Sequence, residues 1–343
     1  METMETVRAA EPTAPTPPTA PSAPSGRPPR RPCNRWMLIP AVLLCLLLTA
    51  AGVWAGREST RRYPLTAAEA QPTGTTTAPS LFDPDYRLLY PDLQVIDDPD
   101  LGVIWIRRQT ALRENTLAAE AFTEKDGVPY YEKDGVRSGL GVDVSEHQGE
   151  VDWEKVRASG VEFAMVRVGY RGYGYGALHE DSYFRANIRG AQAAGLRVGA
   201  YFFSQAVTPA EAREEADFAA NLLHGYTLDL PLAMDWEAIT QDSARTDEVE
   251  AEALTALCRA FCEQTEKNGY PPMLYMYKTL AYRRLTLGDF PDVPFWIAEL
   301  QDTPSFFYRF SLWQYSYEGH VDGIDGFVDM NLGFFGADGE LIR

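Results

Sequence analysis

The chain has 343 residues, of which 45% are hydrophobic and 12% aromatic, and its formal net charge is −18 at neutral pH. Residues 1–62 carry eight Arg and four Glu, whereas the remainder carries 23 basic and 45 acidic residues. Such an acidic body lacks the basic patches that neutralise phosphates, which excludes nucleic acid as a partner. Four cysteines are too few for a disulfide scaffold in a chain of this length. Because no Cys or His spacing typical of a metal site occurs, we expect no metal and no cofactor.

The N-terminal region divides by composition into a tail and an apolar stretch. Residues 1–35 are rich in Pro, Ala and Thr without apolar periodicity, which predicts a disordered tail on the cytoplasmic side. Residues 36–56 are uncharged and, at about 1.5 Å rise per residue, long enough to cross a bilayer as a transmembrane anchor. Arginines are slightly more numerous before this stretch than after it, which favours an extracellular body. We therefore expect a single-pass membrane protein whose C-terminal body lies outside the cell. The alternative is a secretory signal cleaved near "TAAG" (49–52), with the body released.

Residues 57–137 separate this stretch from the body. Residues 57–80 form a polar linker, and residues 81–137 a small N-terminal extension without a readable role. Within the extension, "LGVIWIRR" (101–108) predicts a strand and "TALRENTLAAEAF" (110–122) a short helix. "DGVPYYEKDGV" (126–136) predicts a hairpin with Asp-Gly turns.

Residues 138–343 alternate between strand-like and helix-like patterns. The helical patterns include residues 181–195, 208–223 and 246–269; the second opens with Thr208 as N-cap and Pro209 at the first position. This alternation predicts a mostly parallel sheet in an α/β fold, and eight strands favour an irregular (β/α) TIM-like barrel. The last two connections are too short for full helices, and an open doubly wound sheet is the alternative. The predicted strands are 140–144, 163–168, 197–203, 231–235, 271–277, 294–298, 310–315 and 326–330.

The fourth strand ends in "PLAMDWE" (231–237), with two acids on alternate positions. Residues i and i+2 of a strand share a face, so Asp235 and Glu237 are expected to project together while Trp236 points into packing. Two acids held this close raise one another's pKa, which keeps one protonated beside an ionised one. Glycoside hydrolysis requires such a pair. Taken alone, the motif also fits two solvated acids at a strand end.

Two further acids fall near strand ends: Asp143 in the first strand and Asp329 in the eighth. Active sites of such barrels lie at the C-terminal ends of the strands, where strands one and eight are neighbours and strand four lies opposite. We therefore expect four carboxylates around one cavity. Aromatic residues near the same ends either offer flat faces to sugar rings or fill the core; they are Tyr170, Tyr201, Phe203, Tyr275, Tyr277, Trp296 and Trp313.

Several blocks between residues 139 and 335 together resemble glycoside hydrolase family 25, the lysozymes that act as N-acetylmuramidases. They include "GVDVSEHQGEVDWEKVRASGVEFAMVRVGYRGYG", "EDSYFRANIRGAQAAGLRVGAYFFSQA", "LPLAMDWE" and "WQYSYEGHVDGIDGFVDMN", in family order. The resemblance implies an often irregular (β/α) barrel that cleaves the β-1,4 bond between N-acetylmuramic acid and N-acetylglucosamine. Peptidoglycan glycan strands are then the partner, and we expect a monomer.

The resemblance also implies roles for individual residues. Glu237 matches the general acid and Asp235 the residue that assists it, while Asp143 and Asp329 match two further acids of the site. Asp235 acts either as a nucleophile or by orienting the 2-acetamido group of the substrate, and the two-residue spacing favours the second route. Positions implied to line the groove are Tyr201, Tyr275, Trp296 and Gln314.

Two positions depart from the family pattern. Phe202 stands where members often carry His, and Leu300 where many carry an aromatic residue. These changes bear on sugar contacts and leave the acid chemistry intact. The alternative function is a catalytically inactive module that binds cell-wall glycan, against which the intact acid set argues.

Overall fold

The computed structural model describes residues 90–98, 101–125, 127–239 and 243–343. The predicted tail, membrane span and linker (residues 1–80) lie outside these ranges. Within the described ranges, no helix has the length and apolar character needed to cross a membrane.

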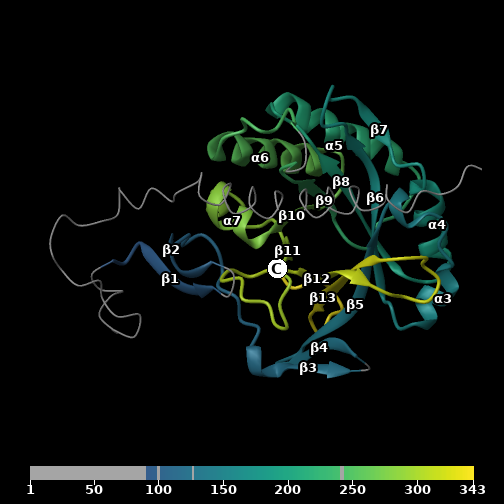
Figure 1. Cartoon of the computed structure of the whole chain (residues 1–343), viewed down its shortest axis with the longest axis horizontal. Helices are drawn as coiled ribbons and strands as arrows, with labels where there is room; N and C mark the ends of the chain where they lie inside the picture. The colour runs from purple at the N-terminus through teal and green to yellow at the C-terminus, as the bar shows by residue number, and fades with distance from the viewer. Residues whose placement is uncertain (1–89, 99–100, 126, 240–242) are drawn as a thin grey trace, which may run out of the picture. The chain divides into compact units, whose positions relative to one another are not determined.

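Eight strands form a closed barrel in a mixed α/β fold (Figure 1). The ring closes because β5 pairs with β13 on one side and with β6 on the other. All eight predicted strands are present, and the open-sheet alternative is wrong. In order around the barrel the strands are β5 (Val136–Val144), β6 (Phe163–Arg171), β8 (Arg197–Ser204), β9 (Leu232–Trp236), β10 (Pro272–Tyr277), β11 (Phe295–Ala298), β12 (Leu312–Gly319) and β13 (Val328–Phe335).

The last strand departs from a regular (β/α) barrel. Neighbouring pairs from β5 round to β12 are parallel, but β13 runs antiparallel to both β12 and β5. Only residues 320–327 connect β12 to β13. A parallel crossover needs about a dozen residues or more, so the chain can only turn back as a hairpin. The TIM-like prediction is therefore correct for the closed barrel and wrong for its final strand.

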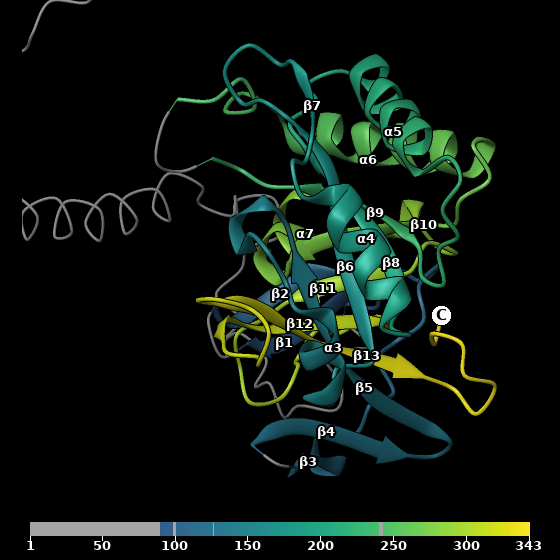
Figure 2. The same ribbon diagram turned by 90° about the vertical axis from the view of Figure 1, so that its right-hand side faces the viewer.

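Helices lie along the outside of the strands (Figures 1 and 2). The helix α5 begins as predicted, since the side chain of Thr208 accepts a hydrogen bond from the amide of Glu211 and Pro209 occupies the first turn. Residues 299–311 and 320–327 contain no α-helix, as their lengths predict. The helices are α3 (Trp153–Ala158), α4 (Phe184–Ala193), α5 (Pro209–Leu223), α6 (Ala251–Lys267) and α7 (Lys278–Arg284).

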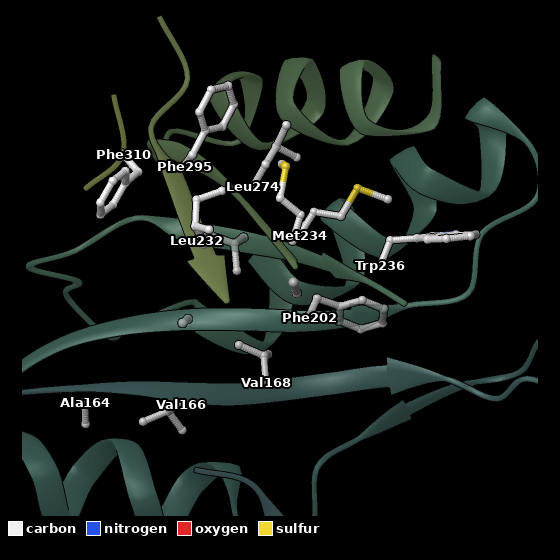
Figure 3. Packing of buried hydrophobic residues seen from close by; sticks show 14 of the residues in the cluster. Ala164, Val166, Val168, Phe202, Leu232, Met234, Trp236, Leu274, Phe295 and Phe310 are labelled. Carbon is white, nitrogen blue, oxygen red and sulfur yellow. The ribbon is translucent and has the colours of Figure 1, made fainter. Parts of the chain in front are cut away.

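Strand alternation divides the core into two layers. Outward side chains such as Val166, Met234 and Leu274 pack beneath the helices (Figure 3). Inward side chains, among them Phe163, fill the barrel interior. Gly141 leaves room for the Phe163 ring, because a Cβ at this position would lie 2.2 Å from the ring carbon Cζ.

The segment before the barrel adds short strands. The predicted strand at 101–108 is present as β2 (Gly102–Arg107), which pairs with β1 (Leu93–Asp98). The predicted hairpin is also present: β4 (Val128–Lys133) joins β5 through a turn at Asp134 and Gly135, both with positive φ, and pairs with β3 (Phe122–Lys125) on its other side. A further short strand, β7 (Leu178–Glu180), pairs with β6.

The helix predicted at 110–122 is wrong. Only Ala119–Ala121 form a 3-10 turn there. The rest of the segment bonds to the barrel instead: the amide of Asn115 donates to the carbonyl of Phe307 at 2.8 Å, and the amide of Arg309 to the carbonyl of Arg113 at 2.9 Å. These tertiary bonds override a weak helix propensity.

Candidate active site

The strand β9 places Asp235 and Glu237 at the open end of the barrel. Met234 and Trp236 point outward, and the indole Nε1 of Trp236 donates to the carbonyl of Ala206 at 3.4 Å (Figure 3). Asp235 therefore faces the barrel interior, where its side chain is buried. Glu237, just beyond the strand, is half-buried and lines the same cavity.

Asp143 and Asp329 form the facing wall. They are register partners across the β5–β13 pair. The sequence predicted Asp329 near the end of a strand, but it is the second residue of β13. Because β13 runs antiparallel, its beginning lies at the edge where the parallel strands end. Asp329 therefore lies at the mouth of the barrel, as expected, but it does so because it begins an antiparallel strand and not because it ends a parallel one.

All four carboxylates line one cavity of about 300 Å³. In the strand order, β9 lies four strands from β13 in either direction, so the two acid pairs face one another across the mouth. The four predicted groove residues line this cavity too. The remaining lining residues are Ser145, His147 and Gln148, which follow β5, Arg167 on β6 and Phe203 on β8.

Two amide side chains fix the wall formed by Asp143 and Asp329. Nε2 of Gln314 donates to Oδ2 of Asp143 at 3.0 Å and to Oδ2 of Asp329 at 3.2 Å. The hydroxyl of Tyr275 donates to Oε1 of Gln314 at 2.9 Å. Asn331, fully buried, donates from Nδ2 to Oδ2 of Asp143 at 2.8 Å. Predicted groove residues thus orient the acids as well as lining the cavity.

Asn331 also explains the position of Trp296. The indole Nε1 of Trp296 donates to Oδ1 of Asn331 at 2.8 Å, and the ring is almost entirely buried. Asn331 was not singled out from the sequence. Its signal was present, because it lies two residues after Asp329 and so shares a strand face with it.

Burial keeps protons on this cluster. It raises the pKa of Asp143 well above the usual value, and the negative charge of Asp329 adds to the effect. It likewise raises the pKa of Asp235, with contributions from Glu237 and Asp143. Burial raises the pKa of Glu237, while the nearby hydroxyl of Tyr275 opposes the rise. A carboxyl group that holds its proton at higher pH than usual is able to act as a general acid.

Asp235 differs from the other acids in its bonding. Its Oδ1 atom is buried and has no hydrogen-bond partner among the described residues. A buried acceptor without a partner is unfavourable unless it serves a ligand or a reaction. This oxygen is an unused acceptor on a residue that lines the cavity.

Arg167 is a buried cation that the sequence analysis missed. It lies on the inward face of β6, where Nε donates to Oδ2 of Asp181 at 2.7 Å and Nη2 to Oε1 of Glu146 at 3.2 Å. Its charge lowers the pKa of Asp235, against the larger effects that raise it. The signal was an arginine inside the apolar run "FAMVRV", in phase with the inward residues Phe163 and Met165.

Gln205 holds the main chain of Glu237. The amide Nε2 of this fully buried residue donates to the carbonyl of Glu237 at 2.8 Å, and its Oε1 accepts from the hydroxyl of Thr246 at 3.1 Å. Arg245 donates from Nη1 to the carbonyl of Gln205 at 3.0 Å. The helix α6 begins at Ala251, five residues later than predicted.

Phe202 and Trp313 are packing residues of the outer core layer. Phe202, which replaces the family histidine, points outward, is fully buried, and packs edge-on against Phe218 with ring centroids 6.1 Å apart. Trp313 is also outward and donates from Nε1 to the carbonyl of Glu299 at 2.7 Å. The substitution at Phe202 therefore changes the helix-facing layer and leaves the cavity lining unaltered. Leu300 is 48% exposed and is not part of the lining.

Comparison with known proteins identifies the family. A closed barrel with facing acid pairs at one mouth is an arrangement suited to carboxylate catalysis on a sugar bond. The sequence model of Glycosyl hydrolases family 25 matches residues 142–324, more than half of the chain. The chain therefore belongs to this family of glycoside hydrolases.

Individual relatives cover only part of the chain. It is 30% identical to the autolytic lysozyme of Clostridium acetobutylicum over 192 residues, which is 56% of this chain and 54% of that protein. It is 27% identical to lysozyme M1 of Streptomyces globisporus over 213 residues, 59% of this chain and 69% of the relative. The chain thus spans about half the length of the first of these relatives.

Among solved structures, the modular autolysin LytC from Streptococcus pneumoniae superposes with a TM-score of 0.51 at 22% identity. The match covers 71% of this chain and 57% of that one. At this level of identity the likeness concerns the fold alone.

Proposed function

We propose that the protein is a peptidoglycan hydrolase, an N-acetylmuramidase that cleaves the β-1,4 bond between N-acetylmuramic acid and N-acetylglucosamine. The observation that carries the proposal is the placement of Asp235 and Glu237 opposite Asp143 and Asp329 around one cavity. Family membership supports glycoside hydrolysis, and the names of two relatives, autolytic lysozyme and lysozyme M1, support this substrate.

In this proposal Glu237 is the general acid. It donates its proton to the glycosidic oxygen as the bond to the sugar C1 breaks and an oxocarbenium-like transition state forms. Burial raises the pKa of Glu237, which supports the role because the group must be protonated before each turnover. The bond from Gln205 to its carbonyl fixes the backbone from which the acid projects.

Asp235 assists the departure of the leaving group by one of two routes. It attacks C1 directly, or it accepts the N–H of the substrate's 2-acetamido group so that the acetamido oxygen attacks. The unpartnered Oδ1 of Asp235 favours the second route, because a free acceptor is what the acetamido N–H requires. A substrate lacking the acetyl group separates the routes: direct attack tolerates its loss, whereas substrate assistance does not.

Asp143 and Asp329 provide the opposite wall. The pair cannot ionise twice without repulsion, and the single negative charge that it shares faces the sugar on which positive charge develops, which lowers the energy of the transition state. The amides of Gln314 and Asn331 hold Asp143 in position by donating hydrogen bonds to its Oδ2.

We further propose that the enzyme acts outside the cell, tethered by residues 36–56 in the bacterial cell membrane. The uncharged composition of this stretch and the flanking arginines support the tether. Release after signal cleavage is the alternative. Detection of the chain in washed membranes or in the culture medium distinguishes the two.

The test of activity is digestion of purified peptidoglycan followed by borohydride reduction. A muramidase leaves N-acetylmuramic acid at each new reducing end, so reduced muramic acid accumulates as the suspension clears. Accumulation of reduced glucosamine would contradict the bond assignment. Binding without any new reducing ends would instead identify a glycan-binding module without catalysis.

A further inference from the structure

We infer that Phe327, beside the acidic cavity, is a stacking platform for a sugar ring of the glycan chain that lies outside the cavity. The inference rests on the proposed function and adds a subsite to it. Phe327 does not line the cavity itself.

The position of Phe327 follows from the alternation of β13. Val328 and Met330 are buried on the outward face, whereas Asp329 is half-buried on the inward face. Phe327 lies two residues before Asp329 and is 58% exposed, so it continues the inward face beyond the barrel. By strand rise the two Cα atoms are separated by roughly 6–7 Å along the chain. Phe327 thus lies just before the strand that carries one of the four acids, and Gln148, which donates to its carbonyl, lines the cavity.

The loop that carries Phe327 is fastened at several points. The amide of Asp152, at the start of α3, donates to the carbonyl of Gly323 at 2.8 Å. Nε2 of Gln148 donates to the carbonyl of Phe327 at 3.3 Å. Val321 and Ile324 are buried against the core. Figure 1 shows the β12–β13 hairpin beside α3, in agreement with these contacts.

A second ring supports the platform. The ring of His320 packs against that of Phe327 with centroids 4.9 Å apart, and its Nδ1 lies 3.2 Å from the carbonyl oxygen of Gly326. The phenyl ring is therefore oriented before any ligand arrives. An oriented ring on a fastened loop loses little conformational entropy on binding, so it contributes more affinity than a mobile one.

A glycan fits this surface for two reasons. The cavity of about 300 Å³ is at the small end of ligand pockets, so sugars beyond the two that share the cleaved bond must lie outside it, on the rim. The C–H faces of a sugar ring are apolar and match a flat aromatic face. The loop also carries the exposed acids Asp322 and Asp325, which disfavour an anionic surface as the partner. The N-acetylglucosamine rings of the chain are neutral and meet no such repulsion.

The test compares long and short substrates. For Phe327→Ala we expect KM on glycan strands of many disaccharides to rise about three- to tenfold, with kcat within about twofold of the parent. For the shortest fragment that is cleaved, KM should not change. Phe327→Trp, which keeps a flat ring, should retain the parent KM. Val103→Ala removes another exposed apolar side chain, on β2 outside the barrel, and should alter neither constant.

An unchanged KM on long strands in Phe327→Ala would overturn the inference, as would an equal rise for the short fragment. Direct retention of glycan strands on immobilised protein separates this result from the proposed activity. Suppose that the parent chain shows no cleavage, and that the Phe327→Ala variant is nevertheless retained less than the parent. The sugar-binding role of Phe327 would then be supported, and the proposed hydrolysis would be contradicted. If the parent cleaves the glycan and the substitution leaves retention unchanged, only the role of Phe327 is contradicted.

Discussion

Asp143 and Asp329 are directly opposed on neighbouring antiparallel strands, and one amide nitrogen, Nε2 of Gln314, donates to an oxygen of each. Two carboxyl groups that share a donor in a buried place cannot both ionise without mutual repulsion. The pair is therefore a fixed source of negative potential beside Glu237. Its effect on the general acid can be measured by removing one member.

Asp329→Asn should move the high-pH fall of activity to lower pH. Burial raises the pKa of Glu237 above 4.5, the nearby hydroxyl of Tyr275 lowers it, and the charge of Asp329 raises it further. Activity that needs protonated Glu237 falls as pH rises through this pKa, so removing the Asp329 charge brings the fall to lower pH. The measurement is the pH profile of kcat/KM, with Asp322→Asn, an exposed acid, as control. If the decrease of kcat/KM stayed at the same pH or moved to higher pH, the coupling between Asp329 and Glu237 would be refuted.

Asp235→Asn should stabilise the fold while reducing activity. Burial raises the pKa of Asp235, so the folded state holds a proton that the unfolded state releases. Stability from this group is complete below the ordinary pKa of about 3.8 and is lost as pH rises through the raised value. The neutral amide avoids that loss, and we expect about 0.5–2 kcal/mol more unfolding free energy at pH 8. Urea titrations at pH 8 and at pH 3.5 should show the gain at the higher pH only. A destabilised variant at pH 8 would contradict the explanation.

Arg167→Met should destabilise the fold strongly. It leaves Asp181, whose side chain is fully buried, without its cation, and breaking a buried pair costs about 3–5 kcal/mol. Arg185→Met breaks a pair of similar length with Glu180 at the surface and should change the unfolding free energy by less than about 1 kcal/mol. Denaturant unfolding of both variants provides the comparison. Equal losses of unfolding free energy in the two variants would contradict a larger contribution from the buried pair.

Gly141→Ala tests the packing of the barrel interior. The added methyl group would meet the ring of Phe163, and overpacking of this kind costs about 1–3 kcal/mol. Phe163→Leu in the same chain should recover part of the loss, because the smaller side chain makes room. Gly174→Ala, which meets nothing within 4 Å, is the matched control. If Gly174→Ala unfolded at a lower temperature than Gly141→Ala, the explanation based on packing against Phe163 would be contradicted.

Much of the barrel was predictable because each strand is a short apolar run bounded by turn residues. The same alternation placed Asp235 inward and Trp236 outward, as the structure has them. The direction of the last strand was not predicted, although the short connection after β12 contained the information. The 110–122 helix failed because its competing bonds come from residues 307–309, almost 200 positions away.

The parts of the site that were missed depend on distant partners. Arg167 is informative only once Asp181 and Glu146 are known to surround it. Gln205 matters because Thr246 and the carbonyl of Glu237 lie on either side of its amide. Strand periodicity reveals which face a residue occupies, but it does not reveal which side chain from another element will meet it there.

The most direct test of the account is the turnover of Glu237→Gln on purified peptidoglycan. The amide keeps the size of the acid and cannot donate the proton, so turnover should fall about 10²- to 10⁴-fold. Circular dichroism and retention on glycan strands should match the parent. A variant that is folded, binds glycan and cleaves it at the parent rate would contradict the assignment of Glu237 as the general acid.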